Sequence, residues 1–152
     1  MLRAGQVQEL VGTVCVGVGP EHAGHQELGS REALAQHADE LAAVILEPML
    51  GGGGCLPATL EFLAMLRAET KARGIVPIFD EVMSSRLHPH GLSAHYGIQP
   101  DLKTLGKYIG GGMSFGAFGG RSDLMQRYDP RDPMALPHGG AFNNNVLTMA
   151  AG

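Results

Sequence analysis

The sequence predicts an α/β protein with a mainly parallel sheet and flanking helices. Two short apolar runs, residues 42–46 and 75–79, have the length of buried strands, and continuous runs of this kind are typical of parallel strands covered on both faces. Residues 57–74 between them place apolar side chains on one broad helical face. Strand, helix and strand in this order predict a right-handed crossover between parallel strands, whose carboxyl ends carry Glu47 and Asp80.

Composition excludes several classes of function. A chain of 152 residues can bury one domain core, and its net charge of −4, without a basic run, does not indicate a nucleic-acid partner. No apolar stretch approaches the roughly 20 residues that span a bilayer, and the N-terminus lacks the layout of a signal peptide. Cys15 and Cys55 lie far apart without metal-type spacing, which favours reduced thiols in a cytoplasmic protein.

The N-terminal segment, residues 1–29, is poorly defined by its pattern. Residues 11–18 alternate as a strand would, and residues 20–29 are typical of a loop. His22 and His25 have a spacing that metal ligands can adopt, but no carboxylate or cysteine cluster accompanies them, so we expect no metal site. Ser30 is suited to cap a helix over residues 31–41.

The middle of the chain continues this alternation of elements. A glycine loop, residues 51–54, precedes a helix that we expect to begin near Pro57 and to end at Gly74. The strand at 75–79 contains Pro77, which lacks a ladder donor and is the weak point of that prediction. Residues 84–97 predict an irregular segment with a short helix, in which the histidines are solvated or locally hydrogen-bonded: His88, His90 and His95.

The C-terminal part predicts three more elements. We expect a strand over residues 113–120, a helix over 121–128, a turn-rich connector over 129–133, and a helix that begins at residue 146.

Lys107 lies between a short apolar run and three consecutive glycines. A phosphate-binding P-loop has its glycines before the lysine and a Ser or Thr after it, whereas here Tyr108 follows, so glycine richness alone supports a nucleotide binder. The arrangement suits a lysine at a strand end beside a backbone that leaves room for a flat cofactor. Lysine amines form Schiff bases with aldehydes, and pyridoxal phosphate also needs an acid such as Asp80 against its ring nitrogen.

Five segments together resemble a known family. They are residues 42–48, 78–83, 100–112, 116–120 and 140–152, and their order is similar to that in the class III (subgroup II, fold-type-I) pyridoxal-phosphate-dependent aminotransferases, in the glutamate-1-semialdehyde 2,1-aminomutase branch. The resemblance covers residues 30–152 and implies the central part of the large domain only. It also implies that the N-terminal phosphate loop and the C-terminal small domain of such enzymes are absent.

The resemblance implies a role for each residue of a cofactor site. Lys107 would form the Schiff base with pyridoxal 5′-phosphate and then move the substrate proton, and Asp80 would pair with the pyridine nitrogen. Val82 would pack beneath the ring, Met83 would lie where some relatives have a polar residue near the cofactor hydroxyl, and Glu47 would lie close to the cofactor. From the residues alone, Asp80 could instead cap the following turn, and Glu47 could pair with an arginine.

Ala141 departs from the family pattern. Relatives usually have a threonine here whose hydroxyl reaches the cofactor phosphate of the neighbouring subunit, so alanine removes one charge-assisted hydrogen bond worth about 1.5–3 kcal/mol. The resemblance implies a homodimer that transfers an amino group between small-molecule donors and acceptors, as a transaminase or an aminomutase. The alternative is a truncated, catalytically inert chain that keeps the fold and binds the cofactor weakly at most.

Overall fold

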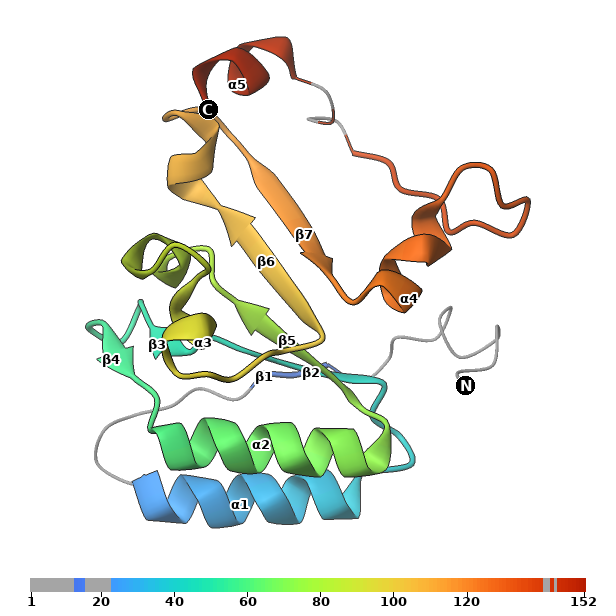
Figure 1. Cartoon of the computed structure of the whole chain (residues 1–152). Coiled ribbons are helices and arrows are strands. Elements are labelled where there is room, and N and C mark those ends of the chain that lie inside the picture. The colour runs from blue at the N-terminus through green and yellow to red at the C-terminus, as the bar shows by residue number, and fades with distance from the viewer. Residues whose placement is uncertain (1–12, 16–22, 141–142, 144) are drawn as a thin grey trace.

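The computed structural model describes residues 13–15, 23–140, 143 and 145–152. Its main sheet has the strand order β1 (Thr13–Cys15), β2 (Ala43–Leu46), β5 (Val76–Asp80), β6 (Leu102–Gly106) and β7 (Gly116–Gly120) (Figure 1). The first four strands are parallel, and β7 runs antiparallel to β6. A short antiparallel ribbon, β3 (Met49–Leu50) with β4 (Leu56–Pro57), follows β2. The mainly parallel α/β sheet that the sequence predicts is therefore confirmed.

Helices α1 (Ala23–Gln36) and α2 (Leu60–Arg73) lie side by side beneath one face of the sheet (Figure 1). Helix α2 begins after Thr59, whose hydroxyl accepts a hydrogen bond from the Phe62 N–H at 3.1 Å, and ends at Gly74 with a left-handed φ of 70°. Pro57 lies in β4 rather than at the helix start. The apolar core forms between these helices and the sheet, and its largest members are Leu34, Leu46, Phe62, Leu63, Leu66, Ile75 and Phe79.

The prediction for the first helix was wrong at both ends. Helix α1 begins at Ala23, inside the segment predicted as a loop, and ends at Gln36, five residues before Leu41. Gly24 and Gly29 lie within it, and each costs only about 1 kcal/mol relative to alanine. The burial of Leu34 against the core offsets a cost of this size. Leu41 still packs against the core, from the turn that follows the helix.

Pro77 is tolerated in the interior of the sheet because its backbone nitrogen, which lacks a hydrogen, faces a part of the neighbouring chain that is not yet in a strand. Strand β5 pairs with β2 on one side and with β6 on the other. The Pro77 carbonyl accepts a hydrogen bond from the Asp101 N–H at 3.0 Å, just before the first β5–β6 pair, which is Ile78 with Leu102. In a parallel strand the N–H and C=O of one residue point to the same neighbour. The Pro77 nitrogen therefore points to the segment that precedes β6, so the absence of its hydrogen removes no bond from the β5–β6 ladder.

The two faces of the sheet differ. Phe79 is buried in the core between the sheet and helices α1 and α2. Its register partner Lys103 points to the same face of the sheet, which we call the helix face. Asp80 and its register partner Thr104 point to the other face, because successive residues of a strand alternate. The helix face also carries α3 (Leu92–His95), which follows the 3₁₀ turn η2 (Ser84–Leu87).

After β6 the chain turns at η3 (Lys107–Gly110) and returns as β7, followed by α4 (Ser122–Met125), η4 (Gln126–Tyr128) and α5 (Val146–Ala151). Helix α5 packs on the glycine turn after Lys107 (Figure 1). A Cβ at Gly111, whose φ is +58°, would collide with the Ala151 carbonyl, and the Thr148 hydroxyl donates to the Ser114 carbonyl at 3.2 Å. These glycines thus make room for a helix, a use that the sequence did not suggest.

Candidate active site

Asp80 lies at the carboxyl end of β5 with one oxygen engaged. Its Oδ1 atom accepts hydrogen bonds from the Val82 N–H and from the Thr104 hydroxyl, each at 3.0 Å. This oxygen therefore caps the following turn, as the alternative interpretation proposed. Within the described ranges, no donor or cation contacts Oδ2. A half-buried carboxylate with one oxygen held and the other available suits a protonated ring nitrogen.

Glu81, the second carboxylate of the pair, has a different environment. It is fully buried and accepts hydrogen bonds from the Leu92 N–H at 2.5 Å, from the Ser93 hydroxyl at 2.5 Å and from the Ser93 N–H at 3.2 Å. Lys103 Nζ lies 3.2 Å from Glu81 Oε1. Glu81 therefore fixes α3 to the sheet and has no capacity left for a ligand. The resemblance assigned the cofactor role to Asp80, and sequence reasoning gave Glu81 no role.

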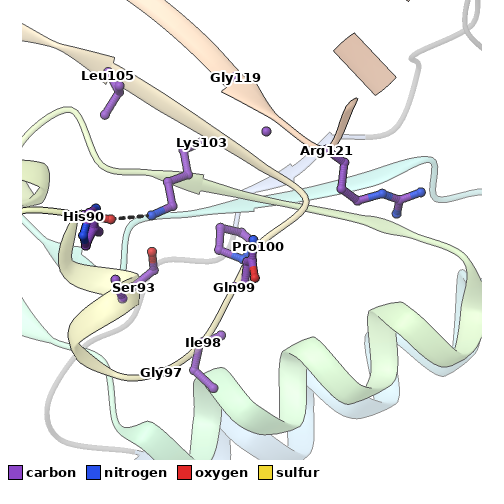
Figure 2. Close-up of a pocket in the computed structure, with 12 residues that line it drawn as sticks. His90, Ser93, Gly97, Ile98, Gln99, Pro100, Lys103, Leu105, Gly119 and Arg121 are labelled. Carbon is purple, nitrogen blue, oxygen red and sulfur yellow. Dashed lines mark hydrogen bonds between the residues drawn. The ribbon is translucent and has the colours of Figure 1, made fainter. Parts of the chain in front are cut away.

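The three lysines of the chain also differ in whether their amines have partners. Lys103 Nζ pairs with Glu81 and donates to the His90 carbonyl at 2.9 Å, as Figure 2 shows. Lys71 is exposed in the last turn of α2, near the start of β5. Lys107 follows the carboxyl end of β6, and no hydrogen bond or ion pair of its amine occurs among the residues described. Of the three lysine amines, it is the one without a described partner at the edge of the sheet where β5 and β6 end.

The backbone of Lys107 is unusual. Its φ is +54°, in the left-handed region that favours glycine, a conformation shared outside glycine only by Cys55 in the described chain. Such a conformation costs about 1–3 kcal/mol and persists where the surroundings enforce it. The strain lies at the residue for which the sequence predicts covalent chemistry.

Val82 lies against the residue that precedes Lys107. A Cβ placed on Gly106 would be 3.4 Å from Val82 Cγ1, so the two segments are in van der Waals reach. Val82 thus presents an apolar surface beside Asp80 and the Lys107 turn, which fits the floor of a site for a flat ring.

Glu47 and Met83 meet at the glycine loop after β2. Glu47 Oε2 accepts a hydrogen bond from the Gly51 N–H at 2.8 Å, and a side chain at Gly51 would collide with the Met83 sulfur. Glu47 shapes this loop and has no arginine partner among the described side chains. Ala141 lies outside the described residues.

The cavity drawn in Figure 2 lies on the helix face. It has a volume of about 600 Å³, and Lys103 and Leu105 of β6 line it together with Ser93, Ile98 and Pro100. Because Asp80 and Thr104 point to the opposite face, this cavity is separate from the candidate cofactor site. In the parts of the chain that the structure covers, no group of three His, Cys, Asp or Glu side chains could hold a metal ion.

The mainly parallel sheet with flanking helices is that of a fold-type-I transferase large domain. A lysine and a carboxylate lie at the carboxyl ends of two of its neighbouring strands, and residues of this type could hold a pyridoxal group. The family itself is established by comparison. The model of the class III aminotransferase family matches residues 18–152, so the chain belongs to that family. The resemblance and the fold class predicted from the sequence are thereby confirmed.

Known relatives include transaminases and an aminomutase. The chain is 56% identical to the β-phenylalanine transaminase of Variovorax paradoxus over 81% of its own length and 28% of the relative's, and 45% identical to the glutamate-1-semialdehyde 2,1-aminomutase of Limosilactobacillus reuteri over 82% and 28%. The crystal structure of the β-phenylalanine aminotransferase from Variovorax paradoxus matches 82% of this chain and 29% of its own with a TM-score of 0.78 and 54% identity. The chain thus spans just over a quarter of these relatives.

The cofactor of the family is pyridoxal 5′-phosphate. A solved transaminase with this cofactor bound matches 82% of this chain and 30% of its own, with a TM-score of 0.77 and 41% identity. For this chain the individual roles of Lys107, Asp80, Val82, Met83 and Glu47 remain predictions. No helix in the described part of the chain is long and apolar enough to cross a membrane.

Proposed function

We propose that this chain supplies the cofactor-binding core of a pyridoxal-phosphate-dependent amino-group transferase. The observation that carries the proposal is that, of two lysines on β6 or directly after it and of two acids at the end of β5, one of each is paired and the other is not. Lys103 and Glu81 pair on the helix face, whereas Lys107 and one oxygen of Asp80, at neighbouring strand ends, have no hydrogen-bond or ion-pair partner among the described residues. Family membership supplies the chemistry that such an amine and acid would serve.

Each residue has a defined task in this proposal. When bound, pyridoxal phosphate supplies an aldehyde and an electron-accepting ring. Lys107 Nζ would hold the cofactor at its aldehyde carbon and would carry the proton that is shifted along the substrate. Asp80 Oδ2 would keep the pyridine nitrogen protonated, Val82 would pack on the ring, and Met83 would border the site beside the loop held by Glu47.

The substrates we propose are small amines and their carbonyl partners. The higher identity to a β-phenylalanine transaminase makes amino-acid transamination the first reaction to test, and the match to an aminomutase makes intramolecular transfer the second. A homodimer is proposed from the predicted position of Ala141 near a neighbouring subunit's phosphate. The exposed free thiol of Cys55 supports a cytoplasmic, reducing compartment.

The test is selective trapping of pyridoxal phosphate on lysine. Purified protein is incubated with the cofactor, reduced with borohydride and digested, and the adduct at each lysine is quantified by mass spectrometry. Lys71, exposed and remote from Asp80, is the internal control. We expect the Lys107 peptide to be labelled at cofactor concentrations that leave Lys71 unmodified, and Asp80→Asn to weaken that preference. Equal labelling of the two lysines in folded protein would contradict the proposal.

Turnover is a separate measurement that addresses the alternative of an inert chain. Amino transfer from β-phenylalanine to a keto acid is followed in the wild-type protein and in Lys107→Ala. Selective labelling of Lys107 without turnover would support a chain that binds the cofactor and does not catalyse. Turnover in the wild-type protein that Lys107→Ala abolishes would support the hypothesis that the chain is an enzyme.

A further inference from the structure

The turn that carries Lys107 is tied to the turn that follows Asp80 by one side chain. The Tyr108 hydroxyl donates a hydrogen bond to Ser85 Oγ at 3.1 Å, and Arg86 Cζ lies 4.6 Å from the centre of the Tyr108 ring. Tyr108 is the second residue of η3, whereas Ser85 and Arg86 belong to η2. The contact therefore joins the segments that continue β6 and β5 beyond the sheet.

The position of this contact gives it mechanical importance. The β5–β6 ladder ends at the pair Asp80 and Thr104, and the last backbone bond between the segments runs from the Glu81 N–H to the Thr104 carbonyl at 3.1 Å. Beyond it, the Tyr108–Ser85 bond is the sole hydrogen bond that joins residues 82–91 to residues 107–113 in the described structure. Without it, no hydrogen bond in the described structure would join the Lys107 turn directly to the turn that follows Asp80.

Ser85 is a firm anchor for this bond. It is 8% exposed, and its N–H donates to the Glu81 carbonyl at 2.9 Å. Glu81 is in turn fully buried and fixed by Ser93 and Lys103. On the other side, the Tyr108 carbonyl accepts a hydrogen bond from the Gly111 N–H at 3.2 Å, which closes the turn after Lys107. The strained left-handed backbone of Lys107 thus adjoins a residue that is held at both its side chain and its carbonyl.

We propose that Tyr108, through Ser85 and Arg86, is a positioning residue that holds the strained Lys107 backbone so that its amine faces the acid at the end of β5. This inference rests on the proposed function, because it concerns the reach of Lys107 to a cofactor. Tyr108 makes no contact with the cofactor in this scheme. It reduces the number of orientations that the Lys107 amine samples before it forms a bond.

The test compares Tyr108→Phe, Ser85→Ala and the double variant in the trapping experiment. The selectivity, defined as Lys107 labelling divided by Lys71 labelling, is measured against cofactor concentration. Removing one neutral hydrogen bond is expected to lower the selectivity about threefold to tenfold in either single variant. The double variant is expected to match the single variants, since both remove the same bond. Tyr128→Phe is the matched control, because it makes the same substitution at a tyrosine whose ring packs on Phe118 and His138 and not on Arg86.

The outcomes separate this inference from the proposed function. If wild-type protein shows no preference for Lys107, the proposed function fails and this inference falls with it. If wild-type protein prefers Lys107 and Tyr108→Phe retains the full preference, only the positioning role is refuted. Thermal unfolding of each variant is measured in parallel, and a lower melting temperature with unchanged selectivity would assign Tyr108 a purely structural role. Should Tyr108→Phe fail to fold, Ser85→Ala alone decides between these outcomes.

Discussion

Replacing Glu81 with alanine should destabilise the fold more than any exposed acidic substitution. The variant removes a fully buried carboxylate that accepts hydrogen bonds from Leu92 and Ser93 and pairs with Lys103 at 3.2 Å. Hydrogen bonds to a charged group contribute about 1.5–3 kcal/mol each, but the Lys103 side chain, 27% exposed, can regain water when its partner is lost. We therefore expect a loss of about 3–5 kcal/mol, the range found when one partner of a buried pair is removed.

The assay is equilibrium unfolding in urea, followed by circular dichroism at neutral pH. With a urea dependence of about 2 kcal/mol per molar, a loss of this size lowers the midpoint by about 2 M. Since small domains are stable by about 5–15 kcal/mol in total, the variant should be partly unfolded in the absence of denaturant if wild-type stability lies near the lower limit.

Two further variants make this measurement specific. Glu81→Gln keeps the side-chain volume and loses the charge, so its loss should lie between those of wild type and Glu81→Ala. Glu32→Ala, exposed on α1, is the matched control and should change the free energy of unfolding by no more than about 0.5 kcal/mol. A loss below 1 kcal/mol for Glu81→Ala would refute the view that this carboxylate holds α3 to the sheet.

Three other predictions concern backbone strain, phosphate binding and a surface ion pair. Lys107→Gly should raise the free energy of unfolding by about 0.5–1 kcal/mol while abolishing cofactor trapping, because glycine adopts a φ of +54° readily; Lys107→Ala, which keeps the strain, should show no gain in urea unfolding. Ala141→Thr should tighten pyridoxal phosphate binding at least tenfold in a fluorescence titration, if the added hydroxyl gives the charge-assisted bond of about 1.5–3 kcal/mol; unchanged affinity with inorganic phosphate absent would contradict this. The hydrogen bond from Arg121 holds the pKa of Asp123 below 3.8, so the contribution of this ion pair is present above that pH and is lost as the pH falls through the folded-state pKa; carboxyl NMR titration should show the pKa of Asp123 rising toward 3.8 in Arg121→Gln.

The sequence predicted the architecture because the signals were local. Apolar runs predicted β2 and β5, the helix between them ends at Gly74 as expected, and the helix from residue 146 begins after Asn145, whose side chain caps it. The start of α1 escaped prediction because Gly24 and Gly29 weakened the pattern and tertiary packing decided the outcome.

The candidate site was predicted by residue type and could not be resolved further without register. Lys107 and Asp80 were chosen from motifs, but only the pairing of Asp80 with Thr104 shows which face of the sheet the acid occupies. The engagement of Lys103, the burial of Glu81 and the bond from Tyr108 to Ser85 depend on contacts between segments distant in the chain. Apart from the resemblance, alternation along β5 is the signal in the residues that separates Asp80 from Glu81.

The two adjacent acids at the end of β5 also act as a check on strand alignment during folding. If β5 paired with β6 one residue out of step, Glu81 would turn to the face that Asp80 now occupies, and Asp80 would turn inward with a side chain too short by one methylene to replace it. Lys103 and the Ser93 amide would then lose their acceptor. A misaligned sheet would thus leave unpaired polar groups beneath α3, so the same two residues that divide binding from architecture also discriminate the native register from its neighbours.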